Sequence, residues 1–265
     1  MPLTEFQAEV LRVIAANRSV GSHVAGGVAL NAAPDTARFS ADIDLFHDAE
    51  EAVAQASEQD CATLSNAGYA IERQLWEPTY RRTWVERDGH GVKIEWAQDA
   101  AWRFFPVESD PLLGWRLHPF DALTNKALAM GARSETRDLV DLVSYADRFR
   151  LAAVGWAACA KDPGWTPVLL LEQMRRNARI DRAALDEMYA RIEPTELKQR
   201  WLRLAEEAEA EILAAARLGL EIGLAFLDKG GAVAWHTMPG AETHRATLGG
   251  VVPRLTGLRY DLPDS

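Results

Sequence analysis

The chain has 265 residues, 48% of them hydrophobic, and a formal net charge of −10 at pH 7. This length and apolar content suffice for one large domain or two modest domains with a sizeable core. The acidic balance argues against a surface that coats nucleic acid broadly, because such a surface gains its affinity from Lys and Arg on phosphates. It leaves a local basic groove open.

The sequence gives no sign of a membrane or export segment. No apolar run approaches the roughly 20 residues of a membrane-spanning helix, and charges interrupt the apolar stretch at the N-terminus, unlike in a signal peptide. The two cysteines, Cys61 and Cys159, fit no metal or disulfide pattern. A cytoplasmic protein without a membrane partner is therefore expected.

The first region is predicted to mix helices and strands. It opens with a helix, because Phe6, Val10, Val13 and Ile14 recur at helical spacing. The next elements expected in chain order are a strand at 23–25, a Gly-Gly turn with a short helix, a strand at 41–46, a helix at 48–66 and a strand at 69–76. Strands at 81–87 and 92–96 flank Asp-Gly-His-Gly, which is a strong hairpin signal.

The second region is predicted to be mostly helical. A helix at 120–130 ends at a break at Gly131, and the next covers 134–150 with Ser134 as its N-cap. An amphipathic helix covers 196–218, and a Gly-rich, strand-like tail follows from Lys229. We therefore expect three parts, at residues 1–118, 119–228 and 229–265.

Asp42 and Asp44 are the most informative pair in the chain. Side chains alternate along a strand, so both acids point to one side while Ile43 and Leu45 face the core. Most acidic pairs are surface residues or caps. A pair on a buried strand is costly unless it is paired or metal-bound, however, which favours a site for divalent cations.

The residues ahead of this pair suit a phosphate. Gly26 and Gly27 would let a phosphate approach the backbone closely, although an ordinary strand-to-helix turn also explains them. Ser40 lies on the same face as the two acids and could touch a phosphate or a metal-bound water. Arg38 fits a phosphate ligand, a surface residue or a loop anchor equally.

Glu95 is the candidate for a third carboxylate. It lies on the polar face of a strand whose other face carries Val92, Ile94 and Trp96. If this strand lies beside residues 41–46, Glu95 can meet the acidic pair, and three carboxylates can hold two divalent ions. Alternatively, Glu95 is a cross-strand partner for Lys93 or for a hairpin arginine.

Lys126, Asp138 and Asp141 form the last candidate group. Lys126 lies among apolar and small residues of its helix, where it would snorkel or reach an anionic ligand. Asp138 and Asp141 are spaced i and i+3, so they share a helix face. Lys126 could neutralise a triphosphate while one acid orients it, or all three could form a salt-bridge network between two helices.

Taken together, these segments resemble the AbiEii/AbiGii group of nucleotidyltransferase toxins, within the DNA-polymerase-β-like superfamily. The resemblance rests on AGGVAL, ARFSADIDLF, VKIEW, the helix with Lys126, and RDLVDL, in that order. It implies an α+β nucleotidyltransferase fold, with a small mixed sheet flanked by helices and a helical C-terminal region that completes the site. It also implies Mg²⁺ (or Mn²⁺), a nucleoside triphosphate, an RNA acceptor such as the tRNA 3′ end, and an antitoxin partner.

The resemblance further implies a role for each candidate residue. Gly26 and Gly27 would cradle the triphosphate, with Ser40 and Arg38 nearby, and Lys126 would contact phosphates. Asp42, Asp44 and Glu95 would bind metal, and Asp141 would complete the site, with Asp138 as the competing choice. Many superfamily members have Gly-Ser where this chain has Gly26-Gly27, which removes one hydroxyl from the cradle.

Two other classes of function fit the same residues. An Asp-x-Asp pair also holds a metal–diphosphate in sugar-nucleotide-dependent transferases and other metal-dependent transferases. A catalytically silent nucleotide-binding protein would keep the fold and bind a triphosphate without releasing pyrophosphate.

Overall fold

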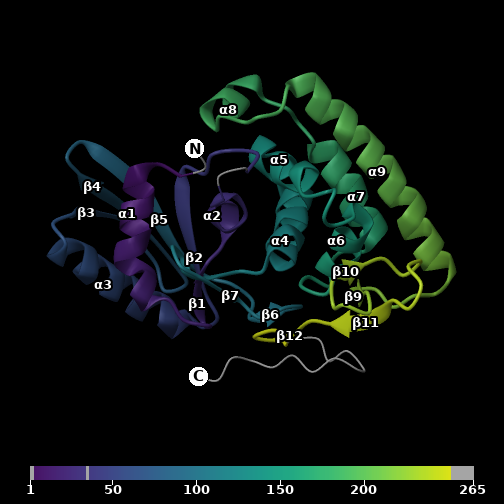
Figure 1. Ribbon diagram of the computed structural model, residues 1–265, viewed down its shortest axis with the longest axis horizontal. Coiled ribbons are helices and arrows are strands. Elements are labelled where there is room, and N and C mark those ends of the chain that lie inside the picture. Colours follow the sequence, from purple (N-terminus) through teal and green to yellow (C-terminus); the bar gives the residue numbers. More distant parts are fainter. Residues whose placement is uncertain (1–2, 34–35, 252–265) are drawn as a thin grey trace.

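The computed structural model describes residues 3–33 and 36–251, which form a mixed sheet beside a thick layer of helices (Figure 1). The main sheet has the order β3-β4-β5-β2-β1-β8-β7. Its strands are β1 Ser22–Val24, β2 Asp42–His47, β3 Ala70–Trp76, β4 Tyr80–Arg87, β5 His90–Gln98, β7 Glu108–Asp110 and β8 Gly114–Arg116. The α+β fold expected from the sequence is confirmed.

The helices divide between the two faces of the sheet (Figure 1). Those before β8 are α1 Glu5–Ile14, the short 3₁₀ helix η1 Ala15–Asn17, α2 Gly26–Asn31 and α3 Glu50–Asn66. Those after it are α4 Pro119–Ala132, α5 Thr136–Ser144, α6 Leu151–Ala158, α7 Pro167–Asn177, α8 Arg182–Glu187 and α9 Pro194–Arg217. Helices α1 and α3 cover one face, and α2 lies between the other face and α4.

The central strands β2 and β5 lie side by side, which was the condition for Glu95 to meet the acidic pair, and they run parallel. Asp42 pairs with Lys93 and Asp44 with Glu95 in this register. Ile43, Leu45, Ile94 and Trp96 point the other way and are fully buried in the core under α1 and α3. The alternation of each strand therefore sends its apolar residues into the core and its charged residues to the opposite face.

The turn between β4 and β5 explains the sharp hairpin. Asp88 and Gly89 both have positive φ, at 55° and 76°. This is the backbone of a type I′ turn, whose twist matches that of the flanking strands and which favours an Asp-Gly pair. The hairpin predicted from Asp-Gly-His-Gly is thus present, and it fixes the register that sets Arg82 opposite Glu95.

Two boundaries in the helical region differ from the sequence prediction. The break expected at Gly131 is wrong, because α4 continues to Ala132. A Cβ at Gly131 would lie 2.6 Å from Leu170 Cδ1, so glycine serves here to let α7 approach α4. The N-cap role of Ser134 is also wrong, since its hydroxyl donates to the Asn177 carbonyl at 2.9 Å and α5 begins at Thr136.

Helix α5 is also shorter than predicted. It ends at Ser144 rather than running on to residue 150. Tyr145 follows as its C-cap, and its hydroxyl donates to the Leu30 carbonyl at 2.6 Å. This contact ties the end of α5 to the end of α2, which the apolar spacing of the sequence could not reveal.

The tail packs back onto the earlier part of the chain. Strand β9 (Leu224–Leu227) lies between β10 (Val233–Ala234) and β11 (Glu242–Arg245), and β12 (Thr247–Leu248) pairs with β6 (Trp102–Arg103). Its strand-like character was predicted. Residues 252–265 of the predicted third part lie outside the described residues.

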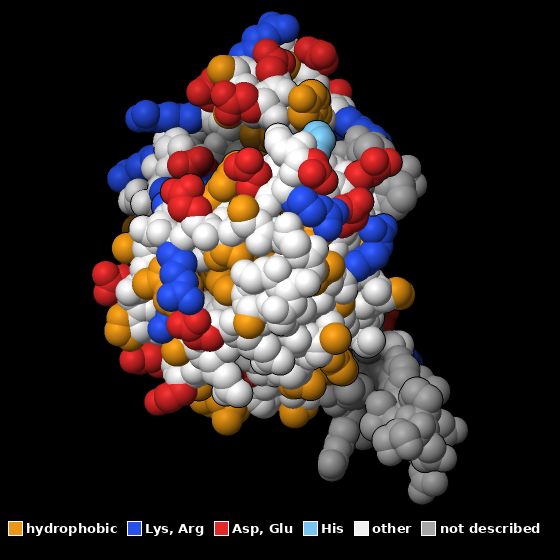
Figure 2. Space-filling view, turned by 90° about the vertical axis from the view of Figure 1, so that its left-hand side faces the viewer, with side chains coloured by type: hydrophobic (Ala, Val, Ile, Leu, Met, Phe, Trp, Pro, Cys, Tyr) orange, Lys and Arg blue, Asp and Glu red, His pale blue; other side chains and the backbone are white. Residues whose placement is uncertain are grey.

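Acidic and basic side chains are interspersed on the face of the molecule shown in Figure 2. Arg73 pairs with Glu58 at 2.9 Å, and Arg87 pairs with Glu9 at 2.5 Å. These arginines of the β3–β4–β5 hairpins therefore belong to a mixed, solvated face rather than a broad basic surface. Within the described residues, no helix is both long and apolar enough to cross a membrane.

Candidate active site

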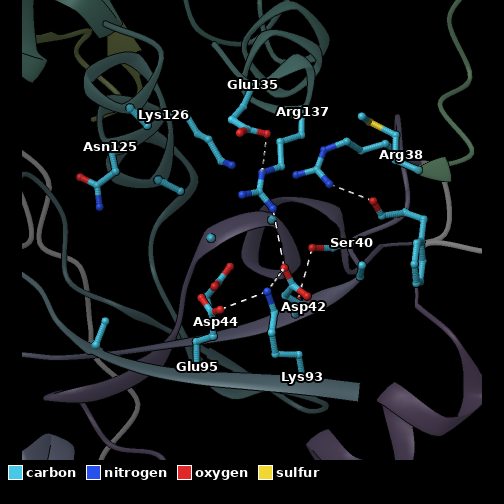
Figure 3. Close-up of a pocket in the computed structure, with 18 of the residues that line it drawn as sticks. Arg38, Ser40, Asp42, Asp44, Lys93, Glu95, Asn125, Lys126, Glu135 and Arg137 are labelled. Atoms are coloured by element: carbon cyan, nitrogen blue, oxygen red, sulfur yellow. Dashed lines mark hydrogen bonds and ion pairs between the residues drawn. The ribbon is translucent and has the colours of Figure 1, made fainter. Parts of the chain in front are cut away.

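Most of the candidate residues line one cavity of about 690 Å³ between the sheet and the helical layer (Figure 3). Strands β2, β4 and β5 form its floor, α2 and the segment before β2 form one wall, and α4, α5 and α8 form the other. The predicted residues that line it are Gly26, Gly27, Arg38, Ser40, Asp42, Asp44, Glu95 and Lys126. Asp138 and Asp141 do not line it.

The glycine pair allows the start of α2 to lie directly against the acidic strand. Gly26 has φ +57°, and a Cβ there would lie 1.9 Å from Asp44 Oδ2. A Cβ at Gly27 would lie 2.4 Å from Ser40 Oγ and 2.7 Å from Arg38 Nη2. Both positions therefore need glycine for close packing, and Gly26 also needs it for its left-handed backbone.

Asp44 is an unpaired carboxylate at the bottom of this cavity. Within the described residues it accepts no side-chain hydrogen bond and forms no ion pair, while Gly26 closes over it. Burial is the main cause that raises its pKa. The charge of Lys126 opposes the rise in pKa, and the carboxylates of Glu95 and Asp42 add to it. Such a group is stabilised by a cation that enters from solvent.

Asp42 and Glu95, in contrast, both form an ion pair with the side chain of Lys93. Lys93 Nζ lies 3.0 Å from Asp42 Oδ2 and 3.1 Å from Glu95 Oε1. Arg82 Nε donates to Glu95 Oε1 at 2.9 Å, and Arg137 Nη1 lies 3.7 Å from Asp42 Oδ2. Glu95 is thus paired with Lys93 and with a hairpin arginine, as the alternative interpretation predicted, and it also lines the cavity beside Asp42 and Asp44.

These contacts shift the titration of the groups involved. Burial alone would raise the pKa of Glu95, but hydrogen bonds from Tyr80 and Lys93 and the charges of Lys93 and Arg82 lower it. Burial alone would lower the pKa of Lys93, but hydrogen bonds to Asp42 and Glu95 raise it. The Lys93 amine is therefore a stable positive charge at neutral pH.

Lys126 reaches the cavity from α4 and is held from behind by α5. Its Nζ lies 2.8 Å from Asp138 Oδ1 and 3.1 Å from Asp141 Oδ2, and both acids are almost fully buried. Arg133 Nε adds a second contact to Asp138 at 3.0 Å. The predicted salt-bridge network between α4 and α5 is therefore present, and Lys126, which belongs to it, also lines the cavity.

Asp141, on α5, binds residues of the opposite wall of the cavity. Arg38 donates to it twice, through Nε at 2.7 Å and Nη2 at 2.8 Å, and Asn31 Nδ2 donates at 3.0 Å. Burial would raise the pKa of Asp141, but the charges of Arg38 and Lys126 and these hydrogen bonds lower it to about 2. Arg38 is thus a loop anchor that also lines the cavity.

Sequence reasoning did not place several lining residues in the site. Tyr80, Arg82 and Arg137 line the cavity, as does Lys93, which was considered only as a partner for Glu95. The hairpin register gave a signal for Arg82, which alternates onto the face of Glu95.

The contribution of α8 had no signal in the sequence. Ala184, Glu187 and Met188 line the cavity because the Phe39 amide donates to the Met188 carbonyl at 2.7 Å. This backbone contact joins the segment before β2 to the end of α8.

The chemistry of the cavity fits a hard divalent ion. Its acidic ligands are carboxylates, the ligands preferred by Mg²⁺ and Mn²⁺, and the unpaired Asp44 is aimed into it. As they stand, however, no three His, Cys, Asp or Glu side chains among the described residues converge on one metal position. The amine of Lys93 lies between the carboxylates of Asp42 and Glu95, in the position that a shared metal ion would need (Figure 3).

Comparisons with known proteins point to one family. The family model described as "Nucleotidyl transferase AbiEii toxin, Type IV TA system" matches residues 23–212. The crystal structure of JHP933 from Helicobacter pylori is similar in fold, with a TM-score of 0.52 and 18% identity over 82% of this chain and 97% of that one. MenT4, a nucleotidyltransferase toxin from Mycobacterium tuberculosis, gives a TM-score of 0.45 and 17% identity over 82% and 91%. No curated protein sequence matches the chain.

Proposed function

The chain belongs to the AbiEii nucleotidyltransferase toxin family, and from this premise we propose that it is an Mg²⁺-dependent enzyme that moves a nucleoside monophosphate from a nucleoside triphosphate to an acceptor hydroxyl. The observation that carries the proposal is Asp44. It is a half-buried carboxylate whose pKa is raised chiefly by desolvation, it has no side-chain partner among the described residues, and it faces a cavity that also presents Lys126 and Arg137. That combination suits a metal–triphosphate complex.

Each group in the cavity has a role in this reaction. Asp44 would hold the divalent ion together with the oxygens of Asp42 and Glu95 that Lys93 does not contact, with Mn²⁺ as an alternative to Mg²⁺. Lys126, fixed by Asp138 and Asp141, would neutralise the triphosphate, as would Arg137. The backbone at Gly26 and Gly27, together with Ser40, would receive its phosphates, while Arg38 holds this wall in place.

The reaction needs positioning more than covalent chemistry. The acceptor oxygen forms a bond to the α-phosphorus, and the bond from that phosphorus to the bridging β-oxygen breaks. Its electron pair leaves with pyrophosphate, and the hydroxyl proton passes through a cavity carboxylate to solvent. The divalent ion supplies charge stabilisation of the phosphoryl group when bound, and the fixed cations of the cavity add to it.

The acceptor that we propose is the 3′ end of an RNA, such as tRNA. Arg82, Arg133 and Arg137 line the cavity, so a locally basic rim exists on a chain whose net charge is −10. Cations of this kind contact backbone phosphates. Blocking an RNA end in this way suits a toxin, and we propose that a cognate antitoxin protein restrains it.

The test combines the protein with Mg²⁺, total RNA and each α-labelled nucleoside triphosphate in turn. We expect label in RNA with the wild type, and none with Asp44→Asn. The matched control is Asp88→Asn, which removes an exposed turn carboxylate far from the cavity.

Three other results would count against the proposal. If Asp44→Asn labelled RNA as well as the wild type does, the acidic pair would not be needed for the reaction. Consumption of a sugar nucleotide instead of a triphosphate would indicate a different transferase. Triphosphate binding without pyrophosphate release would indicate a silent nucleotide-binding protein.

A further inference from the structure

We propose that the Lys93 ammonium takes the place of a second divalent ion, so that this chain uses one divalent ion per nucleotide. The inference rests on the proposed function and specifies how the same carboxylates work. Its basis is the unequal pairing of the three acids: Asp42 and Glu95 share Lys93, and Asp44 has no partner within the described residues.

The position of Lys93 is set by the sheet. It lies directly opposite Asp42 in the parallel register of β2 and β5, and it lies two residues before Glu95 on the same face of β5. These two relations bring its Nζ within 3.0 Å of Asp42 Oδ2 and 3.1 Å of Glu95 Oε1. Three carboxylates can in principle bridge two metals. Here the Lys93 ammonium bridges two of the three carboxylates, those of Asp42 and Glu95.

The surroundings keep the ammonium there. Glu95 also accepts from Arg82 at 2.9 Å, and Asp42 lies 3.7 Å from Arg137. A divalent ion between Asp42 and Glu95 would thus have to expel Lys93 or lie within a few ångströms of three positive groups. An ion beside Asp44 meets no such competition, because no cation of residues 3–33 or 36–251 lies within ion-pair distance of that carboxylate.

The same position lets Lys93 serve the reaction. Its side chain is 27% exposed and lines the cavity, so one of its protons can reach a ligand oxygen. It can therefore donate to the phosphoryl group or to the acceptor oxygen, where a second metal would otherwise stabilise charge. We assign Lys93 as a fixed cation that acts beside the single metal.

The experiment counts ions by equilibrium dialysis with Mn²⁺ and the non-hydrolysable α,β-methylene analogue of the nucleotide. The measured quantity is the ratio of bound Mn²⁺ to bound nucleotide at saturation. We expect a ratio of one for the wild type and a ratio of two for Lys93→Met, which keeps the side-chain length but removes the charge. Lys93→Arg keeps the charge and should retain the ratio of one.

The matched control is Lys198→Met, which removes an exposed lysine on α9 and should leave the ratio at one. A wild-type ratio of two would overturn the proposal, and so would a ratio of one in a folded Lys93→Met. Thermal melts of all variants establish folding. If the wild type and Lys93→Met both bound nucleotide without any Mn²⁺, the metal site of the proposed function would itself be wrong, which is a separate result.

Discussion

Replacing Asp141 with Asn should destabilise the fold strongly, because Asp141 joins the two walls of the cavity. The change removes the negative charge from a pair whose side chains are only 3% and 1% exposed, and it leaves the Arg38 guanidinium buried without a counter-ion. Breaking such a pair costs about 3–5 kcal/mol. Asn keeps the shape and one acceptor, so we expect about 3 kcal/mol. For a chain of this size that corresponds to a fall of roughly 6–12 °C in the unfolding temperature.

The assay is thermal and urea unfolding of Asp141→Asn beside Asp44→Asn. Asp44 forms no ion pair with the part of the chain that the structure describes, and desolvation disfavours its charge, so its replacement should leave stability unchanged or slightly higher while activity is lost. Activity alone cannot separate the two roles, since both variants should be inactive. Equal stability of the two variants would refute the assignment of Asp141 as an anchor and Asp44 as a ligand.

Three further outcomes follow from the structure. Gly26→Ala should abolish activity, because its Cβ would lie 1.9 Å from Asp44 Oδ2 and its φ is +57°; nucleotide binding and transfer assays check this. Gly155→Ala, inside α6, adds a Cβ that lies more than 4 Å from every described atom outside its two chain neighbours and the helix's own nearby backbone; it should stabilise the fold by about 0.5–1 kcal/mol without changing activity, as urea unfolding will show. The pKa of Asp141 is lowered from 3.8 to about 2, so its contribution is complete above about pH 4 and is lost as the pH falls towards 2; the stability gap between wild type and Asp141→Asn should shrink over that range by about 2 kcal/mol.

The strand that carries the acids could be predicted because its acidic residues and its apolar residues alternate with the same period of two. Alternation put Asp42 and Asp44 on one face, with Ile43 and Leu45 in the core, and the structure places them so. Alternation in the hairpin did the same for Glu95. That β5 lies beside β2 was the one assumption needed to bring the three acids together, and the structure has these strands paired in parallel.

The partners of these acids could not be predicted, because the sequence gives faces but not distances. Lys93 and Glu95 share a face whether or not Lys93 reaches across to Asp42, and only the register decides. Asp138 and Asp141 share a face in the same way. Their different roles depend on Arg38, which is 103 residues away from Asp141 in the chain.

The predictions of an N-cap at Ser134 and of a helix break at Gly131 were wrong for a related reason. Ser134 has the residue type of an N-cap, but its hydroxyl finds a tertiary acceptor in Asn177. Gly131 has the residue type of a helix end, but close packing of α7 against α4 explains it. In both cases a long-range contact overrides the local propensity, as it commonly does.

The contacts around Asp141 also bear on the division of the chain. The strand-rich part contributes Arg38 and Asn31 to this carboxylate, and the Tyr145 hydroxyl binds the Leu30 carbonyl. Asp121 Oδ1 and Oδ2 accept from the amides of Phe104 and Phe105 across the same boundary. We therefore propose that the boundary at residue 118 marks a change of secondary structure rather than the end of a unit that folds alone.

That arrangement has a consequence for how the active site is held together. The carboxylates that we propose as metal ligands lie on the sheet, whereas Lys126 lies on α4, so the distance between them is set by the interface of the two parts. Asp141 fixes that interface with three contacts, two from Arg38 and one from Asn31, and it also binds Lys126 of α4. Its buried charge thus acts through geometry: it keeps a lysine and a phosphate-binding wall at a fixed distance from the acids, and the catalysis that we propose depends on this positioning.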